Sequence, residues 1–411
     1  MDMVRNHQEI VLKEHQSESY ALSPSEVKAL LQAENKYVRL QPTTTEGTYQ
    51  LQASHYVGFI ILPTGRTVDI RPKVEIDVLF YMLAKAHGLA HFQPEVHGYR
   101  SVADLFEFVV NYFVTVVEDL AAQGILQDFV PVEEERRTVR GKVLLAETLR
   151  QRPVVRDRHW CRYVSFTPDV AENQILKLAV RGLFAFRYEQ FPDLNGRLHR
   201  LIRLFVDVQP ETEVDHLFSR LAYHRLNEHY RPALALARLL LAHLSPSGAT
   251  GAIPFPAFLV DMNRLFEAYV SVVLQEQVPG TGLRLAVQDA RHLDYGPSPI
   301  IPVRPDVVFY RDELPLAVLD VKYKRSRPGD DVYQVVAYCH AFGTHKAILV
   351  YPAVESASGQ GKRHRIRSHG RLEVTVIPLD LSGSIASLHR QTSAFIRQVL
   401  QEVDYTNWSP S

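Results

Sequence analysis

Two short apolar runs with a polar connection between them constrain the fold of this chain most. The runs cover Val303–Tyr310 and Leu316–Tyr323, and the connection is Arg311–Pro315. Both runs are rich in the β-branched and aromatic residues that favour strands. A short polar connection that ends in proline favours a tight turn, so the pattern predicts a β-hairpin.

Two acids and a lysine converge in this hairpin. If the turn is centred near Glu313, the antiparallel register sets Asp306 opposite Asp320. Lys322 then points to the same side as Asp320, because side chains alternate between the two faces of a strand. An exposed acid and a surface ion pair are the alternative. However, Asp320 ends the apolar run LAVLD, where a buried carboxylate is costly without a partner or a metal.

The elements predicted around the hairpin divide the 411 residues into three regions, since the chain is too long for one ordinary core. Residues 1–98 are predicted as a small β-rich module, residues 99–250 as a mainly helical region, and residues 251–411 as an α/β domain. The first region has a helix at Ser23–Glu34 and strands at Tyr49–Ser54, Tyr56–Leu62 and Arg66–Arg71. Further helices are predicted at Ile76–His87, Ser101–Gln123, Asp169–Tyr188, Leu198–Val206, Val214–Leu226 and Pro232–Leu244. After the linker Ser245–Gly251, helices are predicted at Asp261–Glu276, Asp331–Phe342 and Ser384–Asp404, and strands at Ala347–Tyr351 and Leu372–Pro378. We therefore expect an α+β multidomain protein.

Composition excludes several classes of protein. A net charge of zero gives no global attraction for nucleic acid, and 46% hydrophobic with 22% charged residues is typical of a soluble globular chain. No apolar run approaches the ~18 residues of a membrane span, and the N-terminus lacks the core of a signal peptide, so we expect a cytoplasmic protein. The two cysteines, Cys161 and Cys339, exclude a disulfide framework and a four-cysteine metal site built from this chain alone.

A phosphate-binding loop is also missing from the sequence. Gly361-Lys362 is followed by Arg363 instead of Ser or Thr, and Ser356 stands where the first glycine belongs. We expect no nucleotide site on this chain.

The hairpin residues suit phosphodiester hydrolysis. Two facing carboxylates supply the oxygen ligands that Mg²⁺ prefers, and a lysine beside them can orient water or stabilise the charge of the transition state. Pro305-Asp306 followed by Asp320-Val321-Lys322 resembles the PD-(D/E)XK nuclease superfamily, whose restriction-endonuclease-like fold is then expected for residues 251–411.

Two helical segments extend this resemblance. Gln334 and Tyr338 share a helix face, and their segment QVVAY resembles the QxxxY element of the RecB-like branch. Glu267 in NRLFEAYV matches the acid that often completes the metal site, with a solvated helical glutamate as an equal alternative. The resemblance implies Lys322 as the catalytic lysine, Gln334 and Tyr338 as supporting residues, and Mg²⁺, or Mn²⁺ in its place, bound by Asp306, Asp320, Glu267 and the Val321 carbonyl.

Basic residues near the hairpin are candidates for contact with DNA phosphates. They are Lys324, Arg325, Arg327, Lys362, Arg363 and Arg365. A solvated loop is the alternative, and it has equal weight for the stretch from Lys362 onward.

A wider resemblance covers most of residues 50–350. The ordered segments GFIILPTGRTVDIRPKV, RGKVLLAETLR, TPDVAENQILK, MNRLFEAYV, LDVKYK and DVYQVVAY resemble the McrC family, the nuclease subunit of modification-dependent restriction systems. The resemblance implies a type IV restriction endodeoxyribonuclease subunit that cuts double-stranded DNA carrying a modified base of the 5-methylcytosine type. It also implies an N-terminal module that engages an McrB-like AAA+ GTPase hexamer, whose GTP hydrolysis this subunit stimulates. Arg66, Arg71 and Lys73 are the exposed candidates for contact with that partner.

Two other functions compete with this interpretation. The first is an assembly or GTPase-activating adaptor that no longer cuts; the intact set of Asp306, Asp320 and Lys322 argues against it. The second is a stand-alone RecB-like repair nuclease. The two unpaired cysteines and the LPTG-containing N-terminal module argue against that function, because such nucleases often carry iron–sulfur cysteines.

Overall fold

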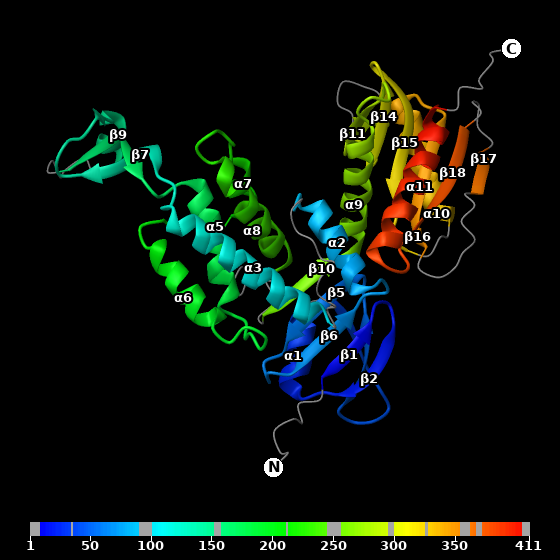
Figure 1. The fold of residues 1–411 in the computed structure, drawn as a ribbon, viewed down its shortest axis with the longest axis horizontal. Helices are drawn as coiled ribbons and strands as arrows, with labels where there is room; N and C mark the ends of the chain where they lie inside the picture. Colours follow the sequence, from blue (N-terminus) through cyan, green and yellow to red (C-terminus); the bar gives the residue numbers. More distant parts are fainter. Residues whose placement is uncertain are drawn as a thin grey trace. The chain divides into compact units, whose positions relative to one another are not determined.

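The computed structural model describes residues 9–33, 36–89, 101–151, 158–210, 213–244, 256–294, 300–324, 328–353, 362–366 and 372–404. The chain forms two compact units, one of residues 1–105 with 251–411 and one of residues 106–250 (Figure 1). Strands and helices occur in both units, which confirms the α+β class. No helix within the described ranges is long and apolar enough to cross a membrane. The predicted linker Ser245–Gly251 lies outside these ranges, and the predicted boundaries at 98 and 250 stay predictions.

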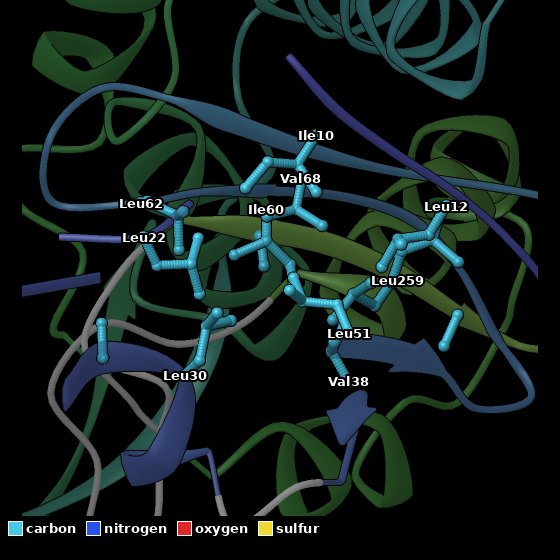
Figure 2. Close-up of a cluster of buried hydrophobic side chains, with 14 residues drawn as sticks. Ile10, Leu12, Leu22, Leu30, Val38, Leu51, Ile60, Leu62, Val68 and Leu259 are labelled. Atoms are coloured by element: carbon cyan, nitrogen blue, oxygen red, sulfur yellow. The ribbon is translucent and has the colours of Figure 1, made fainter. Parts of the chain in front are cut away.

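Two sheets enclose a core in the N-terminal part of the first unit. One has the strand order β1-β6-β5-β10 and the other β2-β4-β3. Their bounds are β1 Ile10–Lys13, β2 Ser17–Ala21, β3 Val38–Pro42, β4 Thr48–Ala53, β5 Tyr56–Ile61, β6 Thr67–Arg71 and β10 Ala257–Asp261. β10 pairs antiparallel with β5 although the helical region separates them in sequence. Figure 2 shows the result: Leu259 of β10 lies in the same buried cluster as Ile60 of β5 and Leu51 of β4.

Helix α1 (Pro24–Gln32) begins where the sequence predicts it. The Ser23 hydroxyl accepts a hydrogen bond from Glu26 N at 3.4 Å, and the Ser23 amide donates to Glu26 Oε2 at 2.8 Å, which is a capping box. Strands β1, β2 and β3 were not predicted. β2 is almost fully exposed, so its residues lack the alternation of apolar and polar side chains that marks a strand in sequence.

A six-stranded sheet forms the C-terminal part of the first unit, with the order β11-β14-β15-β16-β18-β17 (Figure 1). Its strands are β11 Arg284–Val287, β14 Val307–Arg311, β15 Leu314–Val321, β16 Lys346–Ala353, β17 Lys362–Ile366 and β18 Leu372–Asp380, beside a small ladder of β12 Arg291–His292 with β13 Pro302–Val303. The helices of this unit besides α1 are α2 Ile76–Ala86, α9 Met262–Gln277, α10 Pro328–Phe342 and α11 Ile385–Asp404. The predicted helices and strands of this region are confirmed to within a few residues at each end.

Helices α10 and α11 cover opposite faces of this sheet. Val335 and Phe342 of α10 lie in one buried cluster with Val374 of β18. The next residue along β18, Thr375, donates a hydrogen bond to Glu402 of α11 at 3.1 Å. Adjacent side chains of a strand point to opposite faces, so the two helices enclose the sheet between them.

The β14–β15 hairpin has the predicted register, but its turn differs from the predicted one and a bulge compensates for the difference. Val307 pairs with Leu319, so one further step sets Asp306 opposite Asp320. The turn is centred between Asp312 and Glu313, half a residue before the predicted centre, and this turn alone would shift the ladder by one residue. A bulge beside Phe309 inserts one extra residue into β15 and restores the pairing.

The second unit combines helices with a three-stranded sheet. Its helices are α3 Val102–Ala122, α4 Leu145–Gln151, α5 Ala171–Leu183, α6 Leu194–Leu204, α7 Val214–Ser219 and α8 Arg231–His243, with a 3₁₀ turn at Glu228–Tyr230. The sheet has the order β7-β9-β8, with β7 Asp128–Arg136, β8 Lys142–Val143 and β9 His159–Thr167. α5 and α7 end before the predicted residues. The charged stretch Glu133–Arg150, for which the sequence predicts a strand, a turn and a helix, contains the end of β7, all of β8 and most of α4, whereas β9 was not predicted.

Candidate active site

The two predicted carboxylates meet at the end of the β14–β15 hairpin. Asp306 is 8% exposed and Asp320 is 2% exposed. The Val321 amide donates a hydrogen bond to Asp306 Oδ2 at 2.7 Å, and Lys322 Nζ lies 2.8 Å from Asp320 Oδ2. The predicted convergence of two acids and one lysine is therefore present in the structure.

The carboxylate of Asp320 is incompletely paired. Its Oδ2 atom is buried and accepts no well-aligned hydrogen bond from the described residues, and its close contact is the ion pair with Lys322. Burial is the largest cause that raises the pKa of both Asp306 and Asp320 from 3.8 to about 6. The charge of Glu267 raises the pKa of Asp306 further, and the charge of Asp306 does the same for Asp320. A cation between these carboxylates would relieve both effects.

Lys322 is held as an ammonium group beside these acids. Its side chain is one-quarter exposed. Burial alone would lower its pKa, but the neighbouring Asp320 and Asp306 raise the pKa above its ordinary value. Lys322 thus places a positive charge next to Asp320. A phosphate oxygen bound there could accept a charge-assisted hydrogen bond from the ammonium group.

Gln334 and Tyr338 of α10 share one face, as predicted. Gln334 Nε2 donates a hydrogen bond to the Tyr338 hydroxyl at 2.7 Å. Burial raises the pKa of Tyr338, and the charge of Asp320 raises it further. Gln334 and Tyr338 therefore lie near the acids. The part of these two residues in catalysis stays a prediction.

Glu267 approaches the acids from α9 and shares a partner with Asp306. Gln288, directly after β11, donates from its side-chain amide to Glu267 Oε1 and, at 3.2 Å, to Asp306 Oδ1. The structure therefore brings Glu267 into the same group of side chains, although its role as a ligand stays a prediction. Gln288 was not predicted from the sequence. It joins Asp306 to a carboxylate on a separate helix, so no local sequence pattern indicated it.

A further buried acid lies next to this group. Asp331 of α10 accepts a hydrogen bond from Tyr351 at 2.6 Å and pairs with Lys324 Nζ at 2.9 Å. Lys324 is half exposed, so this predicted DNA contact already has an intramolecular partner. Tyr323, between the two lysines, is buried and donates a hydrogen bond to Glu14 at 3.2 Å. The end of β15 is thereby tied to the N-terminal sheets of the same unit.

The other residues predicted to contact DNA or the partner differ in their location and exposure. Lys362, Arg363 and Arg365 lie on β17, the edge strand of the six-stranded sheet, while Arg325 and Arg327 lie outside the described residues. Of the predicted partner contacts, Lys73 is exposed and Arg71 is half exposed beside Asp69. Arg66 is not an exposed side chain, because it is only 15% accessible and donates to the Ala21 carbonyl at 2.9 Å. Whether these residues bind DNA or a partner stays a prediction.

The raised pKa values predict that Asp320→Asn stabilises the metal-free protein. With the folded pKa of about 6 above the ordinary 3.8, ionised Asp320 destabilises the fold above about pH 6, and this penalty disappears as the pH falls toward 4. Removing the charge should raise the free energy of unfolding by on the order of 2 kcal/mol near pH 8 in the presence of a chelator. Urea unfolding at several pH values measures this difference.

The exposed turn residue Asp312 provides the control, because Asp312→Asn removes a carboxylate far from the acids and should leave stability unchanged. A metal-free Asp320→Asn protein that is less stable than the wild type near pH 8 would contradict the assigned environment of Asp320.

Comparisons with known proteins identify a family and similar folds. The family model of the McrBC 5-methylcytosine restriction system component matches residues 51–352. A solved structure of a half-complex from a tetradecameric assembly of Thermococcus gammatolerans McrB AAA+ hexamers with bound McrC is similar in fold. That match has a TM-score of 0.58 and 19% identity over 95% of this chain and 100% of the other.

A second structure, of the Thermococcus gammatolerans McrBC complex, matches with a TM-score of 0.40 and 23% identity over 65% of this chain and 87% of the other. No curated protein sequence matches this chain. The family match covers well over half of the chain and includes the hairpin with Asp306, Asp320 and Lys322. The chain therefore belongs to the family of McrBC 5-methylcytosine restriction system components.

Proposed function

We propose that this chain is the DNA-cutting subunit of its restriction system, a phosphodiester hydrolase that works with a separate AAA+ GTPase. The observation that carries this proposal is the convergence of Asp306, Asp320 and Lys322 at one end of a buried hairpin. The six-stranded sheet with helices on both faces supports a PD-(D/E)XK nuclease domain. Two mutually repelling buried acids next to one lysine have no evident structural purpose, whereas they suit metal-assisted hydrolysis.

The residues at the hairpin fit a divalent cation that keeps part of its water shell. No cluster of three or more His, Cys, Asp or Glu side chains within the described ranges is arranged to hold a metal ion. Mg²⁺ needs fewer protein ligands than such a cluster, since it is bound through one or two carboxylates and leaves its other positions to water and phosphate. The Oδ2 atom of Asp320 is buried and accepts no well-aligned hydrogen bond within the described part of the chain, so a bound cation would stabilise this atom most.

Asp306 and Asp320 would hold Mg²⁺, with the Val321 carbonyl as a third ligand and Glu267 as a further acid. When bound, Mg²⁺ would neutralise phosphate charge and make bound water easier to deprotonate. The Val321 amide fixes the orientation of the Asp306 carboxylate. Lys322 places its ammonium group next to Asp320, where it can stabilise the negative charge that develops on the phosphate.

A partner that hydrolyses GTP is part of the proposal. The similar structure contains McrB AAA+ hexamers with bound McrC, and the present sequence has no phosphate-binding loop. A separate motor would therefore supply the nucleotide chemistry. Modified double-stranded DNA is the proposed substrate, with Lys324, Arg325, Arg327 and the β17 residues Lys362, Arg363 and Arg365 as contacts to its phosphates.

Reconstitution tests this function. The chain, an AAA+ GTPase partner of the same restriction system, GTP and Mg²⁺ should together cut a plasmid that carries 5-methylcytosine. Omitting the chain, GTP or Mg²⁺ should each abolish cutting. GTP hydrolysis that the chain stimulates without any cutting would instead identify a non-cutting adaptor, and cutting by the chain without GTP would identify a stand-alone nuclease.

A further inference from the structure

Gln288 makes three hydrogen bonds that connect two acids of the site. Its backbone amide donates to the Asp306 carbonyl at 3.0 Å, and its side-chain amide donates to Asp306 Oδ1 at 3.2 Å. The same nitrogen donates to Glu267 Oε1. One residue therefore holds a carboxylate at the start of β14 and a carboxylate on α9, two elements that are not adjacent in sequence.

The backbone of Gln288 has a strained conformation in which it makes these contacts. Its φ is +54°, and the described part of the chain has only two other non-glycine residues with positive φ, His15 and Asp312. This conformation costs on the order of 1 kcal/mol and persists only where the surroundings enforce it. For Asp312 the reason is the hairpin turn. For Gln288, this conformation accompanies hydrogen bonds from both its backbone and its side-chain amide to Asp306.

The chemistry of a carboxamide suits this position. Its NH₂ group carries two N–H donors, so it can satisfy two carboxylates at once while adding no charge. Lysine or arginine would also bridge the acids, but would cancel the negative charge that attracts a cation. Glu267 is partly buried and Asp306 is buried, so an apolar residue here would leave two neighbouring carboxylates without their shared donor.

We propose that Gln288 is a positioning residue that holds Glu267 and Asp306 in place for a divalent cation. This inference rests on the proposed function, since it assigns a role in preparing the same site. Gln288 does not itself contact the reacting phosphate; it acts through the two acids.

Two variants with a matched control test the proposal. Gln288→Met keeps the length of the side chain and the backbone strain but removes the donor. Gln288→Gly removes the side chain and also relieves the strain, so it protects the test against a failure to fold. Asp312→Gly is the control, because it relieves the same kind of strain, at φ +52°, in an exposed turn.

The first measurement is binding of Mn²⁺ to the purified full-length chain by calorimetry, together with the thermal midpoint of each variant. We expect Gln288→Met and Gln288→Gly to weaken Mn²⁺ binding roughly 10-fold or more, as loss of such outer partners usually does, while Asp312→Gly binds like the wild type. A purely structural role would change the thermal midpoint and leave the affinity of the folded protein intact.

The second measurement is DNA cutting by the reconstituted complex as Mg²⁺ is varied. The Gln288 variants should need about the same factor more Mg²⁺ for half-maximal cutting, approach the wild-type rate at high Mg²⁺, and keep the wild-type KM for DNA. Wild-type Mn²⁺ affinity in both Gln288 variants would overturn the proposal while leaving the nuclease function standing. A wild-type chain that neither binds Mn²⁺ nor supports cutting would instead overturn the proposed function and this inference with it.

Discussion

Lys322→Ala should reduce DNA cutting by the reconstituted complex by roughly 10²–10³-fold or more, the usual cost of losing one group that stabilises transition-state charge. Lys322 Nζ lies 2.8 Å from Asp320, where the attacked phosphate would be bound, and within the described residues no other cation pairs with that acid. The initial rate of plasmid cutting measures the loss. Assembly with the GTPase should be unchanged, because the lysine lies inside the site.

Lys324→Ala is the matched control. It removes a lysine two positions further along, whose charge is paired with Asp331 at 2.9 Å instead of with Asp320. We expect less than about a 10-fold loss from this change, through a weaker DNA contact only. A Lys322→Ala variant that cuts as fast as Lys324→Ala, within about 10-fold of the wild type, would remove Lys322 from the chemistry.

Gly58→Ala should destabilise the first unit by about 3–5 kcal/mol, an exceptionally large effect for a single methyl group. A Cβ atom at this position would lie 2.0 Å from the carbonyl oxygen of Phe258 on β10, and the backbone φ of Gly58 is +136°. Neither backbone strand can move without breaking the β5–β10 ladder. Urea unfolding of the full chain measures the loss, and hydrogen exchange should show the amides of β5 and β10 losing protection together.

Gly65→Ala separates the clash from the backbone preference. Gly65 has a φ of +83°, but a Cβ atom there meets nothing within 4 Å. We expect a cost of only about 1 kcal/mol, the usual penalty of the left-handed conformation. Similar losses for both variants would mean that β10 does not pack against β5 as described.

The site was predictable because its central part is local in sequence. In a hairpin, the period of two and the turn position fix which residues face each other, so Asp306, Asp320 and Lys322 could be placed together without a structure. The success was partly fortuitous, since the bulge beside Phe309 compensates for a turn that differs from the predicted one. Gln334 and Tyr338 were equally local, as neighbours on one helix.

Features that depend on distant pairing were not predictable. Nothing in the segment Ala257–Asp261 shows that it completes a sheet with β5, because that pairing depends on the rest of the fold. β9 pairs with β7 although a turn and a helix separate the two strands in sequence, and this pairing is visible only in the structure. Glu133, for example, faces Arg162 at 2.5 Å. Gln288 joins two acids from separate elements, so its contacts could not be inferred from sequence spacing alone.

The central claim is that this chain cuts DNA with Asp306 and Asp320. Its most direct test is linearisation of a 5-methylcytosine plasmid by the reconstituted complex, with wild-type chain or with the double variant Asp306→Asn and Asp320→Asn, while GTP hydrolysis is followed in the same reaction. We expect cutting by the wild type only, with GTP hydrolysis retained in both. Cutting by the double variant at the wild-type rate would contradict it, because the chemistry would then belong to another site or another chain.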